Sequence, residues 1–196
     1  MAFDFPNDLG PRKVKVRYVS NVVEPENNDA SVDQRFAQLG SRFAVDVTYP
    51  PMVHANARRL IAALLRAETE ETVFYFRQPG LPAAQRDAVG WRPFSAASSA
   101  NATVINLGGD TAATVLGGQF GTVLANDGRP RLIAAVQTNA VPGALIIRPP
   151  LRIPTSDAAG VDFVNVRLQG FGPKGVSWDV DEAHHYGLSF SIKESK

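Results

Sequence analysis

The sequence contains no cysteine, which excludes disulfide bridges, thiolate metal sites and cysteine nucleophiles. It also lacks an excess of charge of either sign, because 20 lysines and arginines stand against 19 aspartates and glutamates. A general nucleic-acid binder would carry a strong basic excess, so a formal net charge of +1 argues against that class. No apolar run reaches the roughly 18 residues of a membrane span, and the N-terminus has no secretory pattern.

What is present is the composition of a globular protein. Of the 196 residues, 44% are hydrophobic and 20% are charged, values close to the globular average. A chain of this size buries roughly 70% of its unfolded surface, which is enough for a core of its own. We therefore expect one domain, or one domain with an insertion, and folding in a cytoplasm.

One segment has the period of an amphipathic helix. Between Met52 and Ala67, apolar residues recur at intervals of three and four positions, which predicts a single buried stripe. Arginines would lie on the opposite side, and Pro50-Pro51 would end the preceding strand and open the helix. The stripe consists of Ala57, Leu60, Ile61, Leu64 and Leu65, and the arginines are Arg58, Arg59 and Arg66.

Most of the sequence on either side of the middle predicts β-strands. Apolar and polar residues alternate there, which is the period of a strand with one face in water. The run Val73–Phe76 is continuous and aromatic instead, which is typical of a more buried strand. The alternating sets are Val14, Val16 and Tyr18; Phe43, Val45, Val47 and Tyr49; Val161 and Phe163, followed by Val164, Val166 and Leu168; and Leu188, Phe190 and Ile192.

The middle of the chain has a different composition. Residues 78–99 are rich in alanine, proline and arginine without a clear period, which predicts a long loop. Short strand candidates then alternate with turn signals, and Asn126-Asp127-Gly128 is a good hairpin signal. Such strands could close into a small barrel or curled sheet. The candidates are residues 102–107, 113–116, 120–125, 131–137 and 144–148.

These patterns together predict a mainly β fold with one amphipathic helix. We expect a discontinuous β-domain made of residues 1–76 and 156–196. Between its two parts, we expect an inserted small β unit at residues 77–155, which begins with the long loop. The sequence has no internal repeat that would suggest a solenoid or a propeller.

The glycines from Gly170 to Gly175 match the dinucleotide-binding fingerprint as a string of letters. That fingerprint works only between a strand and a helix of a βαβ unit. Here Pro173 lies inside the string, and Val176–Trp178 after it has the composition of a strand. A turn between two strands is therefore the favoured interpretation. Lys174 is not a phosphate-loop lysine, because the required spacing is absent.

One cluster near the C-terminus has the residue types that bind metals. A metal site requires these groups to converge on one point with a supporting second shell. A solvated hairpin tip is the favoured interpretation, with a metal site as the alternative. His54, in the first turn of the predicted helix, is more typical of a surface or interface residue than of a general base. The cluster consists of Asp179, Asp181, Glu182, His184 and His185.

No pattern for nucleophilic catalysis is present. The Gly-x-Ser-x-Gly elbow is absent, and Ser98-Ser99 lies in an alanine-rich segment without a signature. Paired carboxylates can lie anywhere in a sequence, so a glycosidase pair is not excluded, but nothing points to one. We therefore expect no catalytic residue, no cofactor and no metal ligand, and a protein that is not an enzyme.

Arginines and aromatic residues interleave around the predicted loop. The arginines of the predicted helix could form a basic strip together with Arg77, Arg86 and Arg92, and Trp91 and Phe94 interleave with them. This arrangement is found in surfaces that stack on nucleic acids or sugars. Because the net charge is near zero, we favour a loop that its aromatic residues anchor against a neighbour. Ligand stacking is the alternative.

Four separated blocks of the sequence resemble the distal tail proteins of siphophages and related prophages. In that family a strand ending in Leu-Pro-Pro-Met leads into an amphipathic helix, as residues 42–65 do here. An aromatic strand then follows, as at Val73–Phe76. Ile147–Arg152 resembles the family's Pro-Pro-Leu-Arg exit from its inserted unit, and Tyr186–Glu194 resembles its closing strand. The blocks stand in the expected order and cover about half of the chain.

The resemblance implies a structural virion protein, assembled in the host cytoplasm. It implies a ring, usually a homohexamer, that joins the tail tube to the hub and tip of a long non-contractile tail. Its partners would be other copies of itself, the tail tube protein and the hub and tip proteins. The implied fold is a tube-type β-sandwich or split barrel with one flanking helix and an inserted small β-barrel. Residues 78–99 match no part of the family.

Three alternatives remain open from the sequence alone. The first is another tail component of the same fold, such as a terminator or a tube subunit. The second is a carbohydrate-binding β module, for which Trp91 and Trp178 would be the exposed aromatic residues. The third is an enzyme, a hydrolase that would need convergent carboxylates or a metal at Asp179–His185. We expect no sequence-specific contact with nucleic acid and no insertion into a membrane.

Overall fold

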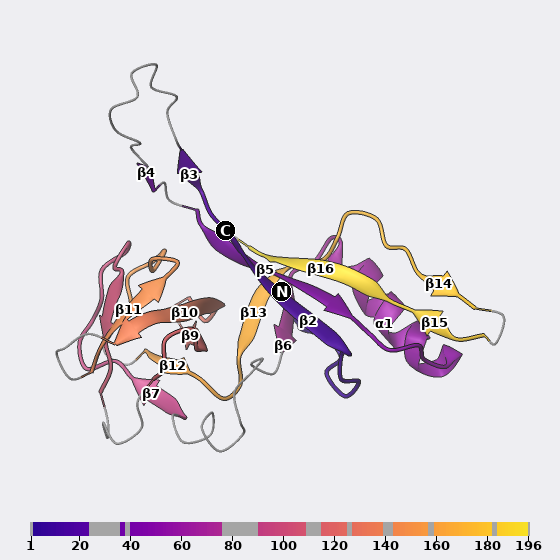
Figure 1. Cartoon of the computed structure of the whole chain (residues 1–196), viewed down its shortest axis with the longest axis horizontal. Helices are drawn as coiled ribbons and strands as arrows, with labels where there is room; N and C mark the ends of the chain where they lie inside the picture. Colours follow the sequence, from indigo (N-terminus) through magenta and orange to yellow (C-terminus); the bar gives the residue numbers. More distant parts are fainter. Residues whose placement is uncertain are drawn as a thin grey trace.

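The computed structural model describes most of the chain. The described residues are 2–23, 36–37, 40–75, 90–108, 115–124, 127–138, 143–156, 159–181 and 184–195. Within them the protein is mainly β with one helix, as the hydrophobic periods predicted. The strands form two six-stranded sheets and two short two-stranded pairs (Figure 1).

The first sheet contains strands from both ends of the chain. Its pairings are antiparallel except for that of the first strand, which runs parallel to its neighbour. The long seven-residue strands at one side alternate as predicted except at Tyr18, which is 43% exposed, and at Ala44, which is buried. In spatial order the strands are β1 (Phe3–Asp4), β6 (Thr72–Tyr75), β13 (Arg167–Phe171), β16 (Ser189–Glu194), β5 (Arg42–Thr48) and β2 (Lys13–Val19).

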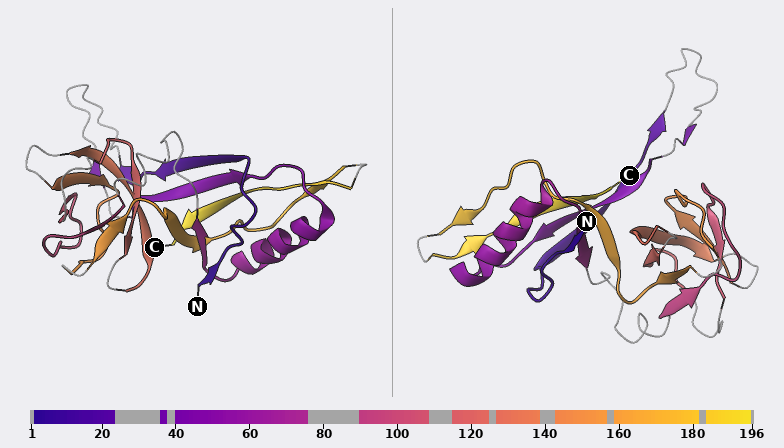
Figure 2. Two further views of the ribbon diagram at one scale, coloured as in Figure 1. Left: turned by 90° about the horizontal axis from the view of Figure 1, so that it is seen from below. Right: turned by 180° about the vertical axis from the view of Figure 1, so that it is seen from behind.

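Helix α1 (His54–Ala67) packs on one face of this sheet (Figure 2). The predicted stripe was correct at Ala57, Leu60 and Leu64, which are all buried. It was wrong at Leu65, whose exposed fraction is 51%. The stripe continues instead through two small residues, Ala63 and Ala67, which allow the helix to approach the sheet closely.

The second sheet curls until its two edges meet. Phe94 and Leu107, which follow the two edge strands, form an isolated bridge. Beside it, the N–H of Gly108 donates to the carbonyl of Pro93 at 2.8 Å. The interior of this sheet is a separate apolar cluster that contains Ile105. In spatial order the strands are β7 (Trp91–Pro93), β12 (Gly160–Asp162), β9 (Phe120–Leu124), β10 (Pro130–Thr138), β11 (Ala144–Arg148) and β8 (Val104–Asn106).

The predicted strands of the middle region are confirmed with two corrections. Residues 115–116 of the candidate at 113–116 are not a strand, and 113–114 lie outside the described residues. The predicted loop at 78–99 contains β7, and its residues 78–89 lie outside the described residues. The hairpin signal was correct, because β9 and β10 pair on either side of Gly128, whose φ is 71°.

The boundary predicted between residues 155 and 156 does not coincide with the division between the sheets. Strand β12 pairs with β7 and β9 and therefore belongs to the second sheet. The reason is burial, because Val161 and Phe163 are fully buried in the core of the second sheet. Whether the second unit can be separated from the first stays a prediction.

Two short pairs of strands extend from opposite ends of the first sheet. The β3–β4 arm consists of β3 (Val22–Val23) and β4 (Phe36–Ala37), which connect β2 to β5. The β14–β15 arm consists of β14 (Asp179–Val180) and β15 (Tyr186–Gly187), which lead into β16. All views place the two arms far apart (Figures 1 and 2).

Candidate interaction surfaces

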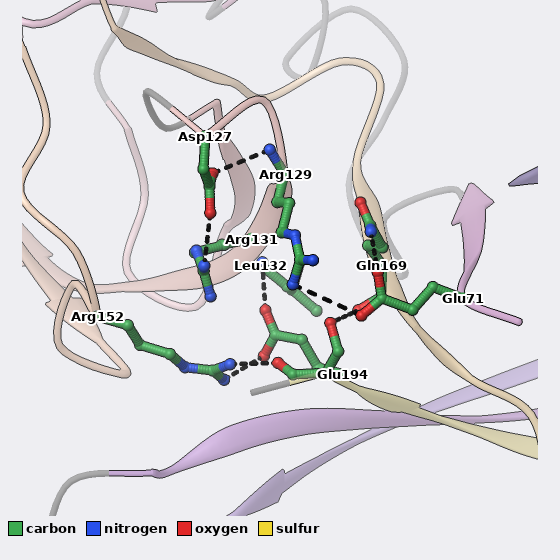
Figure 3. A network of polar contacts seen from close by, with 9 residues as sticks. Glu71, Asp127, Arg129, Arg131, Leu132, Arg152, Gln169 and Glu194 are labelled. Carbon is green, nitrogen blue, oxygen red and sulfur yellow. Dashed lines mark hydrogen bonds and ion pairs between the residues drawn. The ribbon is translucent and has the colours of Figure 1, made fainter. Parts of the chain in front are cut away.

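The two sheets meet at a buried carboxylate, that of Glu194 at the end of β16. Its Oε1 accepts a hydrogen bond from the N–H of Leu132 in β10 at 3.0 Å. Its Oε2 accepts from the N–H of Phe43 in β5 at 3.2 Å and from Nη2 of Arg152 at 2.8 Å. One side chain thus holds both sheets and the segment that follows β11 (Figure 3).

Burial decides how this carboxylate titrates. The side chain of Glu194 is 2% exposed, and that of Arg152 is 16% exposed. Loss of hydration raises the pKa of Glu194, although Arg152 and the two backbone N–H donors oppose part of that effect. Arg152 also donates hydrogen bonds to the backbone carbonyls of Ser195 and Ser41. The guanidinium therefore ties the C-terminal strand to the start of β5.

Further polar contacts line the same junction. Thr122 in β9 donates its hydroxyl to the carbonyl of Arg167 at 3.0 Å and accepts from the N–H of Arg167 at 2.8 Å. Glu71 accepts a hydrogen bond from Nε2 of Gln169 at 2.6 Å and lies 3.6 Å from a nitrogen of Arg129 (Figure 3). These contacts link β9 and the start of β10 to the first sheet.

Apolar packing continues across the junction. Leu132 is fully buried in the core of the first sheet, although its strand β10 belongs to the second sheet. The ring of Phe120 meets the ring of Phe43 edge to face, with centroids 5.6 Å apart. The two sheets therefore share part of one core. None of these long-range contacts has a signal in the sequence.

The β14–β15 arm has an exposed apolar side. Trp178 and Val180 have exposed fractions of 41% and 50%. The arm is fixed to the body through Tyr186, which forms a bridge with Met52 and whose hydroxyl lies 2.8 Å from Nδ1 of His54. His54 is thus a contact between the helix and the arm. This supports its interpretation as a surface or interface residue.

The described residues of the predicted metal cluster lie in β14 and between β14 and β15. Asp181 accepts a hydrogen bond from the N–H of His185 at 2.7 Å, and its carbonyl accepts from His184 at 3.0 Å. Glu182 lies outside the described residues. Within the part of the chain that the structure describes, no three acidic, histidine or cysteine side chains are arranged to hold a metal ion. Asp181 therefore binds the backbone of His184 and His185, and Asp179 is exposed.

The glycine string lies where the sequence predicted a turn. Gly170 belongs to β13, and a Cβ there would collide with the carbonyl oxygen of Lys193 in the neighbouring strand. Gly172 approaches Ala67 at the end of the helix, and Gly175 has a φ of 79°. The glycines therefore permit close packing and a turn, and within the described residues no helix follows them.

The remaining candidate residues lie apart from one another. Trp91 has an exposed fraction of 52%, whereas Phe94 is buried in the core of the second sheet and has no surface for ligand stacking. Arg77 and Arg86 lie outside the described residues. Ser98 pairs with Thr155 beside the second sheet, while the three histidines lie on the helix and the β14–β15 arm.

No protein-family model matches the chain, and no curated protein is similar to it in sequence. Among the described residues, no helix combines the length and the apolar character that crossing a bilayer would require.

Proposed function

We propose that this protein is a structural subunit of a phage virion, the distal tail adaptor ring that links the tail tube to the hub and tip of a long non-contractile tail. The observation that carries the proposal is the pair of arms at opposite ends of one sheet. Strands β5 and β16 run antiparallel, and each meets a different arm at its start. A subunit with different contact elements at its two ends suits the heterologous contacts of a cyclic ring.

Three features support this proposal beside the sequence resemblance. The fold has one amphipathic helix on a sheet built from both ends of the chain, and a second β unit lies between those ends. The exposed apolar residues of the arms offer contact area, with Trp178 and Val180 on one arm and Val22 on the other. In this proposal, the first sheet corresponds to the tube-type domain and the second to the inserted barrel.

The β14–β15 arm provides the test. Trp178→Ala combined with Val180→Ser removes exposed apolar area without touching either core, so the folded subunit is retained while the ring is lost. The mass in solution, measured by light scattering after size exclusion, is expected to fall from about six subunits to one. Trp91→Ala is the matched control, because it removes an exposed tryptophan from the second sheet. Equal masses for the wild type and the arm variant would contradict the proposal.

A carbohydrate-binding module is the second candidate. One observation favours it, the exposure of Trp91 on edge strand β7, where a sugar ring could stack. This function predicts that the protein is a monomer that binds glycans. The variant Trp91→Ala should lose glycan binding, and Trp178→Ala is the control. A glycan array on which both variants retain the wild-type signal would remove this candidate.

A further inference from the structure

The face of the first sheet that points away from the helix has an unusual composition. Partners in an antiparallel ladder point to the same side, so the pairing of Lys15 with Asp46 and of Asp46 with Ser191 defines that face. The neighbouring positions, such as Val45 and Ile192, point into the core. We call this surface the open face; on β2, β5 and β16 its polar residues are Lys13, Lys15, Arg17, Arg42, Asp46, Thr48, Ser189, Ser191 and Lys193.

The open face is strongly basic although the whole chain is nearly neutral. Five cations share it with a single acid, Asp46, among the described residues of these three strands. Arg17 already engages that acid through two hydrogen bonds of 2.6 and 2.8 Å. Four other carboxylates are bound by arginines away from this face, in the pairs Asp8–Arg59, Glu70–Arg66, Asp127–Arg131 and Glu194–Arg152. The fold therefore gathers cations on one face, although the net charge of the whole chain is close to zero.

The arrangement of these groups suits a row of phosphates. Lys13, Lys15 and Arg17 alternate along β2, which spaces them by about 7 Å, and Lys193 lies two strands away, at about 10 Å. Hydroxyl groups between them, on Thr48 and the two serines of β16, are donors of the type that bind phosphate oxygens.

Within β2, β5 and β16 the open face has no aromatic side chain, but Phe171 of β13 pairs with Lys193 and is 41% exposed on the same face. Tyr75 of β6 also lies on that face, with the guanidinium of Arg167 over its ring. One open ring does not stack successive bases, so the surface suits a phosphate backbone better than a single strand.

Two simpler roles for this surface fit fewer of its residues. Lysines on an edge strand prevent sheets from joining edge to edge, which accounts for Lys13 and Lys15 but not for Lys193 on the interior strand β16. A protein partner is disfavoured because lysine and serine are depleted in protein interfaces.

We propose that the open face binds the phosphate backbone of duplex DNA without reading its sequence. This inference does not rest on the proposed tail function.

The test is anisotropy of a labelled duplex of about 30 base pairs, titrated with the full chain between about 50 and 200 mM salt. We expect micromolar binding that is independent of base sequence. The double variant Lys15→Gln with Lys193→Gln removes two phosphate contacts. Its affinity for the duplex should fall about tenfold or more, and the slope of log K against log salt concentration should become shallower by about 1.8. The matched control, Arg58→Gln with Lys174→Gln, removes two exposed cations from the helix and a turn and should behave as the wild type.

Three results would overturn the proposal. One is the absence of binding to the duplex at the lowest salt. Another is an equal loss of affinity in the two double variants, because the duplex would then be attracted by the total charge of the protein and not by the open face. The third is binding to vesicles of anionic phospholipid without binding to the duplex. Thermal unfolding of both variants serves to confirm that each is folded, and no core residue is changed in either.

Discussion

At the scale of single residues, the ion pair between Arg152 and Glu194 lies where the two sheets join. Arg152→Met would leave a buried carboxylate without its cation, which is expected to cost about 3 kcal/mol of unfolding free energy at neutral pH. The cost should shrink near pH 4, because a protonated Glu194 needs no cation. Urea unfolding at the two pH values measures this. Lys174→Met, at an exposed turn, is the control and should stay within about 0.5 kcal/mol of the wild type.

Glu194 also gives the protein a defined pH dependence. Its pKa in the folded state is raised above the ordinary value of 4.5, so the folded state holds the proton more tightly than the unfolded state. The stability that this group contributes is complete below about pH 4.5 and is lost as the pH rises through the folded-state pKa. The difference in unfolding free energy between the wild type and Glu194→Gln should therefore decline from pH 4 to pH 7. An increase would mean that Arg152 outweighs burial.

At the scale of elements, helix α1 offers an internal comparison. Leu60 is fully buried against the sheet, so Leu60→Ala should cost about 2 to 5 kcal/mol through lost burial and the cavity it leaves. Leu65→Ala is the matched control, because Leu65 is about half exposed in the same helix and should cost less than about 0.5 kcal/mol. Denaturant midpoints of the two variants measure the difference. Equal losses would mean that the helix packs by a different face.

Elements with a clear period could be predicted, and those without one could not. The alternation in β2, β5 and β16 and the stripe of α1 are local signals in the sequence. They arise because burial on one side of an element requires apolar residues at the period of that element. Pairs of two-residue strands, such as those of the arms, are too short to have a period. The sheet to which β12 belongs depends on a pairing with β9, and no local pattern encodes its partner.

The junction could not be predicted for the same reason. Glu194 meets donors that lie 62 and 151 residues away along the chain, and its own neighbours look like any alternating strand. The open face has no signal in the composition, because net charge is a sum over the chain, whereas binding depends on where charges lie. Only the pairing of β2, β5 and β16 brings its lysines together.

At the scale of the whole molecule, the shared core predicts cooperative unfolding. Leu132, Phe120 and Glu194 bind the second sheet to the first, so neither sheet should melt alone. We expect one calorimetric transition whose calorimetric and van't Hoff enthalpies agree. Two resolved transitions would mean that the units are separable, as the sequence suggested. The measurement suits the monomeric arm variant, since assembly would complicate the wild-type trace.

The central claim is that this chain assembles with itself through its two arms. The most direct test is the mass of the wild-type protein in solution, measured by light scattering across a wide range of concentrations. The ring predicts a discrete species near six times the 21.1 kDa of one chain, with little between it and the monomer. A mass of one chain at every concentration would contradict self-assembly and make glycan binding the leading account.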